Sequence, residues 1–128
     1  MEMINSIGRR KSSTARIYVT NGSGQIIING KELKEYFPMP MTQATVLEPL
    51  KTTGVEGQYD IKINVSGGGF KGQAEAIRMG ISRSLVKISE DNKKPLKEKK
   101  YLTRDAREVE RKKFGKPKAR KSFQFSKR

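Results

Sequence analysis

The sequence contains no cysteine, no histidine and no tryptophan among its 128 residues. Without cysteine it forms no disulfide, no thiolate zinc site and no cysteine nucleophile, and without histidine it lacks the commonest general base. The remaining acidic, serine and lysine residues show no spacing typical of a catalytic constellation. We therefore expect no enzymatic activity, no catalytic residues, no metal, no cofactor and no small-molecule substrate.

Long apolar runs are missing as well. No segment approaches the roughly 20 apolar residues that a membrane-spanning helix requires. The first residues, MEMINSIGRRKSS, include the acidic Glu2 and no apolar core, so they do not resemble a signal peptide. The chain length fits one small domain with a modest core, followed by an extension.

Acidic residues are scarce in the last part of the chain. Residues 1–92 hold 12 basic and 9 acidic groups, whereas residues 93–128 hold 16 basic and 4 acidic groups. This asymmetry indicates a nucleic acid or an anionic membrane as partner. The membrane is the weaker alternative, because the basic residues do not lie opposite a wide apolar face.

The last 18 residues, RKKFGKPKARKSFQFSKR, contain no acid at all and nine Lys or Arg. We call residues 111–128 the C-terminal arm. Its composition offers almost nothing to bury, so it is predicted to be disordered when free and to order on a dense polyanion. The phenylalanines that interrupt its charges, Phe114, Phe123 and Phe125, suit packing against RNA bases or sugars.

A change in composition near Asn92 divides the chain into three parts. The breaker sequence Asn92-Lys93-Lys94-Pro95 places the end of a globular body, residues 1–92, at this point. Residues 93–110 are predicted to be a basic connector, helical or extended, in which residues 96–110 form the candidate helix. The C-terminal arm follows this connector.

Apolar periodicity predicts both strands and helices in the body. Alternation predicts strands at residues 14–20, 25–29 and 59–66, the first two of which are expected to pair as a hairpin across the turn Asn21-Gly22-Ser23-Gly24. Helical spacing predicts a short helix at 31–37, a second at 42–53 and a long amphipathic one at 70–89.

Two details of these helices are open to test. In the second helix, Thr42 is a candidate cap, Pro49 argues for a kink or an early end, and Gly54 marks the exit. In the long helix, apolar residues form one stripe that begins at Phe70. The expected solvent-side cations of this helix are Lys71, Arg78, Arg83 and Lys87.

The glycine sequence Gly67-x-Gly69-x-x-Gly72 follows a strand and opens a helix. Formally it is a dinucleotide-binding fingerprint, but that motif needs a second strand after the helix, and no apolar strand leads to Glu90 and Asp91. A simple turn from strand to helix is the plain alternative. In a third interpretation, bare amides at the helix N-terminus, beside Lys71, bind a backbone phosphate of RNA.

The basic run Arg9-Arg10-Lys11, with Arg16 in the next strand, also has two interpretations. Charge runs are usually solvated, and this one fits the outer face of a strand. The flanking glycine and serines suit close approach of a phosphate, and the charge of the whole chain calls for such partners. We therefore favour a phosphate contact.

Several ordered blocks of the chain resemble one family of small-subunit ribosomal proteins, the ninth in the standard numbering. The blocks are Gly8-Arg9-Arg10-Lys11 with Ala15-Arg16, Asn29-Gly30-Lys31 with Tyr36-Phe37, the stretch GGGFKGQAEAIRMGISRSL over residues 67–85, Leu102-Thr103-Arg104-Asp105, and the terminal Gln124-Phe125-Ser126-Lys127-Arg128. Two departures occur in the arm: Phe123 stands where members often carry proline, and Lys116-Pro117 alters the usual glycine and lysine run.

The resemblance implies an α+β fold: a small sheet with helices packed on it, a left-handed βαβ crossover, and an extended basic C-terminal arm. It also implies a structural, cytoplasmic ribosomal protein that binds small-subunit rRNA in the head, beside neighbouring head proteins. The arm would reach the anticodon stem-loop of P-site tRNA through Ser126, Lys127 and Arg128. A free nucleic-acid chaperone or compacting protein is the alternative that the same charge allows.

The residues expected to bind rRNA come from all three parts of the chain. They are Arg9, Arg10, Lys11, Arg16, Gly68, Gly69, Lys71, Arg83, Arg104, Arg107, Arg111, Lys112, Lys113, Lys116, Lys118, Arg120 and Lys121.

Overall fold

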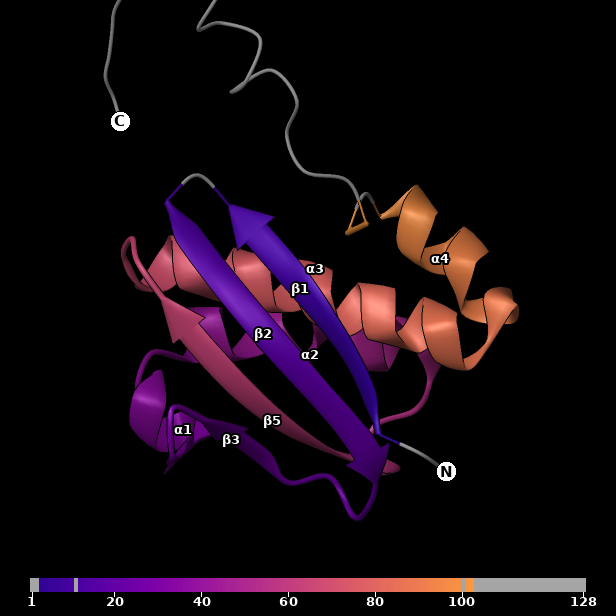
Figure 1. Cartoon of the computed structure of the whole chain (residues 1–128), viewed down its shortest axis with the longest axis horizontal. Coiled ribbons are helices and arrows are strands. Elements are labelled where there is room, and N and C mark those ends of the chain that lie inside the picture. Colours follow the sequence, from indigo (N-terminus) through magenta and orange to yellow (C-terminus); the bar gives the residue numbers. More distant parts are fainter. Residues whose placement is uncertain (1–2, 11, 100, 103–128) are drawn as a thin grey trace, which may run out of the picture.

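The computed structural model describes residues 3–10, 12–99 and 101–102, which form one sheet and a set of helices (Figure 1). The strands are β1 (Ile4–Arg10), β2 (Ser13–Asn21), β3 (Ile26–Ile28), β4 (Lys31–Glu32) and β5 (Tyr59–Ser66). The helices are α1 (Leu33–Tyr36), α2 (Pro40–Thr53), α3 (Phe70–Ile88), the 3₁₀ turn η1 (Glu90–Asn92) and α4 (Lys93–Glu98). The fold is α+β, as expected.

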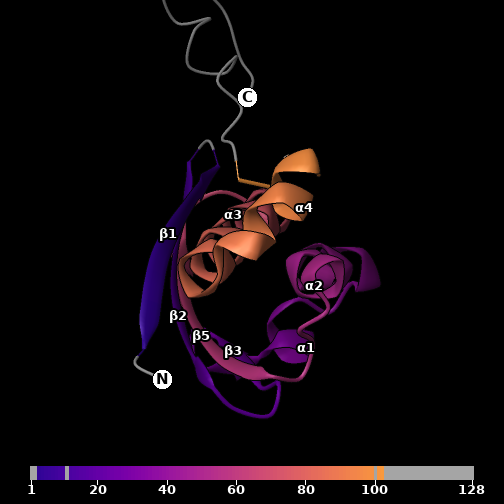
Figure 2. The same cartoon turned by 90° about the vertical axis from the view of Figure 1, so that its right-hand side faces the viewer.

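The five strands lie in the order β1-β2-β5-β3-β4. All neighbours are antiparallel except β3 and β5, which run parallel. The chain crosses from β3 to β5 through β4, α1 and α2. Figure 2 shows α1, α2 and α3 on one face of the sheet, so the fold has two layers and leaves the opposite face of the sheet uncovered by these helices.

Alternation along the strands directs the apolar side chains toward the helices. Ile17 and Ile63, which are paired across β2 and β5, are fully buried. From α3, Ile77, Ile81 and Leu85 are also buried and join the same core. Burying each such side chain contributes about 1.5–3 kcal/mol, so this layer is the main source of stability.

Two glycines let α3 approach the sheet closely. A Cβ atom at Gly8 of β1 would lie 1.9 Å from the carbonyl oxygen of Ala76, and one at Gly80 of α3 would lie 2.4 Å from Cγ1 of Ile17. Both distances are shorter than any real contact. The absence of side chains at these two positions therefore fixes the spacing between helix and sheet.

The structure contains a strand that was not predicted and overturns the predicted pairing of another. The strand β1 was not predicted, because its inward positions are held by Ser6 and Gly8 and the apolar alternation is lost. The strand predicted at 25–29 exists as β3, but it pairs with β5 and β4 and not with β2. The carboxylate of Asp60 accepts hydrogen bonds from the backbone N–H groups of residues 23–25. These bonds direct the chain away from β2 at this point.

The second helix begins earlier than predicted and continues past its proline. The first residue of α2 is Pro40, and the hydroxyl of Thr42 donates to the Met39 carbonyl without capping the helix. Pro49 is buried inside α2, which runs on to Thr53 and ends at Gly54 in the left-handed conformation, φ 73°. The predicted exit at Gly54 is confirmed, whereas the early end is not.

Packing continues beyond the boundary expected at residue 92. Leu96 of α4 is fully buried in the core, and Tyr101 and Leu102 pack against it. The side chain of Asn92 donates to the Leu85 carbonyl and holds this turn on the end of α3. In the described part of the connector the helix spans 93–98, so it begins before the predicted helix at 96–110 and overlaps only the first residues of that range. Residues 103–110 lie outside the described part. The C-terminal arm lies outside the described residues.

Candidate RNA-binding surfaces

One candidate surface forms where the β1–β2 hairpin meets the glycine loop that opens α3. The hydroxyl of Ser13 donates to the Gly67 carbonyl at 2.9 Å. A Cβ atom at Gly67 would lie 2.0 Å from the Ser12 carbonyl oxygen, and one at Gly68 would lie 2.2 Å from Oγ of Ser13. Both glycines also have positive φ values, 81° and 66°. The loop is thus held tightly against the tip of the hairpin.

This junction brings together four of the predicted rRNA-binding residues. Gly68, Gly69 and Lys71 are exposed, and Gly69 is the N-cap residue of α3 with no side chain to satisfy the first backbone N–H groups. Nε of Arg10 donates to Oε1 of Glu75 on α3 at 2.6 Å. The positive end of the α3 dipole and two cations therefore lie at one place. Lys11 lies outside the described residues.

A hydrogen-bonded chain that the sequence did not reveal supports the glycine loop. The side chain of Asn29 both accepts from and donates to the backbone of Val65, at 2.9 and 3.0 Å. The hydroxyl of Tyr36 donates to Oε1 of Gln73, whose Nε2 donates to the Gly67 carbonyl at 3.1 Å. Nδ2 of Asn29 also donates to the Tyr36 hydroxyl at 3.3 Å, so the contacts join the end of β3, β5, α1, α3 and the loop. Their partners lie up to 37 residues apart, so no local pattern indicated them.

The open face of the sheet holds a separate pair of predicted residues. Arg9 and Arg16 are exposed, and Arg9 lies opposite Thr14 while Arg16 lies opposite Ile7. Successive residues of a strand point to opposite faces, so Arg9 is separated from its neighbour Arg10. The structure therefore divides the basic run between two surfaces.

The predicted residue Arg83 lies along the free edge of β1. Its guanidinium donates to the Ile7 carbonyl at 2.9 Å, and Lys87, one helical turn later, donates to the Asn5 carbonyl at 2.5 Å. Both side chains reach from α3 over the outermost strand of the sheet. They satisfy carbonyls that otherwise offer a template for another strand, which is a known liability of edge strands. Arg83 remains exposed.

Arg78 is not the solvent-side cation that the helical pattern predicted. Its guanidinium donates to Glu48 of α2 at 2.9 Å and lies 4.7 Å from the ring centre of Tyr101. Burial of the Tyr101 hydroxyl, and then the nearby charge of Glu48, raise the pKa of Tyr101 above its usual value. The cluster ties α2, α3 and the last described residues together.

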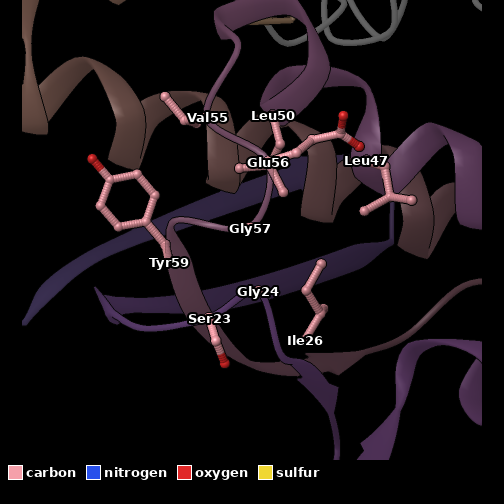
Figure 3. A pocket seen from close by; sticks show the side chains of 9 residues that line it. All are labelled: Ser23, Gly24, Ile26, Leu47, Leu50, Val55, Glu56, Gly57 and Tyr59. Atoms are coloured by element: carbon pink, nitrogen blue, oxygen red, sulfur yellow. The ribbon is translucent and has the colours of Figure 1, made fainter.

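A cavity of about 180 Å³ lies at the opposite end of the sheet, between the turns that follow β2 and α2 (Figure 3). It is lined by Ser23, Gly24, Ile26, Leu47, Leu50, Val55, Glu56, Gly57 and Tyr59. None of the predicted site residues borders it. Within the described ranges there is also no cluster of three or more acidic side chains suited to a metal ion, and no helix there is long and apolar enough to cross a membrane.

The glycine fingerprint lacks the setting that dinucleotide binding needs. In the described part of the chain, α3 is followed by η1 and α4 and not by a further parallel strand. The remaining predicted site residues lie outside the described part. They are Arg104, Arg107, Arg111, Lys112, Lys113, Lys116, Lys118, Arg120 and Lys121, with Ser126, Lys127 and Arg128 at the end of the arm.

Comparisons with known proteins agree with a ribosomal role. Residues 8–128 match the model of a family described as "Ribosomal protein S9/S16". Curated relatives named "Small ribosomal subunit protein uS9" are 56% identical in Azobacteroides pseudotrichonymphae, 56% in Porphyromonas gingivalis ATCC 33277 and 57% in Amoebophilus asiaticus, each over all 128 residues and the whole of both chains. The two-layer fold and its basic surfaces are thus those of a ribosomal protein. The chain belongs to the ribosomal protein S9/S16 family.

Proposed function

We propose that this protein is a structural constituent of the small ribosomal subunit, where it binds rRNA of the head in the cytoplasm. The observation that carries the proposal is the match to small-subunit proteins over the full length of the chain. The uneven charge supports it, because the 16 basic residues after position 92 face only 4 acidic ones. A polyanion is the partner that such a chain requires.

In the folded part, the junction of the hairpin with the glycine loop is the proposed phosphate-binding surface. Gly69 has no side chain to cap the first backbone N–H groups of α3, so these groups are available to a phosphate, and Gly68 beside it is exposed. Lys71 adds a positive charge on the first turn of the helix. Glu75 partly neutralises Arg10, so Arg10 adds little net charge to this surface and mainly holds the end of β1 against α3.

The arm carries the finer part of the proposal. Its nine cations neutralise rRNA phosphates that a folded domain is too wide to reach, and its last three residues approach the anticodon stem-loop of P-site tRNA. These contacts hold the backbone and do not read bases. The crossover between β3 and β5 is proposed to be left-handed, as the family resemblance implies.

Sedimentation in high salt tests the proposed function. Ribosomal particles from cells that produce a tagged full-length chain are washed in high salt and separated on a gradient. An integral subunit protein stays with the small subunit at one copy per particle, because its contacts depend on shape complementarity as well as on charge. Release into the soluble fraction would favour the free nucleic-acid chaperone, whose binding rests on charge alone.

A further inference from the structure

The open face of the sheet carries an aromatic residue between cations. Tyr18 of β2 is flanked by the fully buried Ile17 and the almost fully buried Val19, so its own side chain points to the opposite face. Lys62 of β5 lies directly opposite Tyr18, and Arg16 lies two residues along the same strand on the same face. Both cations are exposed. None of the described elements packs on this face (Figure 2).

The described residues place three cations and two acids on this face of the sheet. Arg9, Arg16 and Lys62 take part in none of the ion pairs among the described residues, which join other side chains. Asp60, on the same strand and face as Lys62, directs its carboxylate to the backbone of residues 23–25. Glu32 of β4 lies opposite Ile27 on this face and takes part in no ion pair among the described residues. Three cations against two acids leave the face with a net positive charge, which favours a ligand that carries negative charge.

The position of Tyr18 adds a second requirement. Within the described residues its ring makes no aromatic contact and its hydroxyl no hydrogen bond, although it is half-buried. Residues directly opposite on neighbouring strands have Cβ atoms about 4.5–5.5 Å apart, so Lys62 is within reach of any group that covers the ring. A flat, apolar group attached to an anion satisfies both requirements at once.

We propose that this sheet face binds an unpaired nucleotide of RNA, with its base stacked on Tyr18 and its phosphates beside Arg16 and Lys62. The inference rests on the proposed function, which supplies the RNA, and it adds a second surface to the junction at α3. Bases inside a duplex are already stacked, so only a single-stranded loop, bulge or end offers a base to the ring. The face is thus expected to bind single strands in preference to a duplex.

Nuclear magnetic resonance of the isotope-labelled full-length chain tests this directly. The chain is titrated with a short oligouridylate at a salt concentration high enough to weaken binding by the arm. The amide signals of Arg16, Tyr18 and Lys62 are expected to shift together, while that of Lys51, on α2 at the other side of the molecule, stays in place. Saturation of the oligonucleotide without shifts on the sheet would overturn the proposal.

Matched variants separate stacking from charge. Tyr18→Ala is expected to raise the local dissociation constant, read from the Arg16 and Lys62 signals, by about 5- to 150-fold. Tyr18→Phe keeps the ring and should bind within about threefold of the parent. Lys62→Gln should weaken binding, whereas Lys51→Gln, which removes the same charge elsewhere, should not. Equal affinity of the alanine and phenylalanine variants would also overturn the proposal.

Photo-crosslinking in intact small subunits distinguishes this inference from the proposed function. If the chain remains in the subunit and Tyr18 crosslinks to a nucleotide, both stand. If the chain remains but Tyr18 crosslinks only to a protein, the proposed function stands and the nucleotide site is refuted. Loss of the chain from the subunit in high salt refutes the proposed function, and the titration above still decides on the sheet face.

Discussion

Arg78 of α3 and Glu48 of α2 form an ion pair of 2.9 Å that joins the two longest of the described helices beside Tyr101. Both side chains are partly exposed, at 27% and 42%. An ion pair so exposed is worth little alone, but here the guanidinium also lies against an aromatic ring. The three groups together hold the last described residues on the body.

Replacing Arg78 with methionine should therefore lower the free energy of unfolding by about 1–2 kcal/mol, from the ion pair and the ring contact together. Urea denaturation of the full chain measures the change. A double-mutant cycle with Tyr101→Leu isolates the ring contact, because the cycle cancels effects that are not shared. Additive losses in that cycle would show that Arg78 and Tyr101 do not interact in solution.

A second prediction concerns the close approach of α3 to β1. Gly8→Ala places a Cβ atom 1.9 Å from the carbonyl oxygen of Ala76, which is backbone and cannot rotate away. We expect a loss of about 1–3 kcal/mol or more in the free energy of unfolding, as for other overpacked cores. Gly69→Ala is the control, because a Cβ atom there meets nothing within 4 Å. Equal stability of the two variants would contradict the packing described here.

The regular elements could be predicted from the sequence where burial alternates cleanly. In β5, Ile61, Ile63 and Val65 are buried and their neighbours face outward, so the strand was recognised with its observed bounds. The long helix α3 could be predicted because its apolar residues recur at helical spacing. In β1 the buried positions are Ser6 and Gly8, which carry no apolar signal, and the strand was missed.

The candidate surfaces were less predictable, because sequence neighbours need not share a face. Arg9 and Arg10 are adjacent in the chain yet belong to different surfaces. The partner of β3 depends on Asp60, which lies 35 residues beyond Gln25. Composition alone therefore indicated the class of ligand, whereas the grouping of the cations required the strand register.

A third prediction follows from the turn that Asp60 organises. Hydrogen bonds from the backbone N–H groups of Gln25, Ser23 and Gly24 hold the pKa of Asp60 below its usual 3.8. A carboxylate whose pKa is lower in the folded than in the unfolded chain stabilises the fold above the unfolded pKa. That contribution is lost as the pH falls below 3.8 and through the folded pKa.

Asp60→Ala should consequently be less stable than the parent at neutral pH, and the difference should shrink as the solution is acidified below about pH 4. Thermal unfolding followed by circular dichroism across this range provides the measurement. Glu56→Ala, in the neighbouring turn, removes an exposed acid and should show no such convergence. A stability gap that stays constant with pH would mean that the carboxylate does not hold the turn.

The last prediction tests the end of the arm. Deleting Ser126, Lys127 and Arg128 removes two cations from the end of the C-terminal arm. We expect small subunits with the truncated chain to assemble normally and to bind P-site tRNA more weakly, with a salt dependence reduced by about one phosphate contact per lost cation. Filter binding of tRNA to purified subunits at several salt concentrations measures both effects.

The double substitution Lys93→Gln with Lys94→Gln removes the same charge from α4 and should leave tRNA affinity unchanged. Unchanged affinity in the truncated subunits would show that the last three residues do not hold tRNA, whereas a loss shared with the control would reduce the effect to general charge.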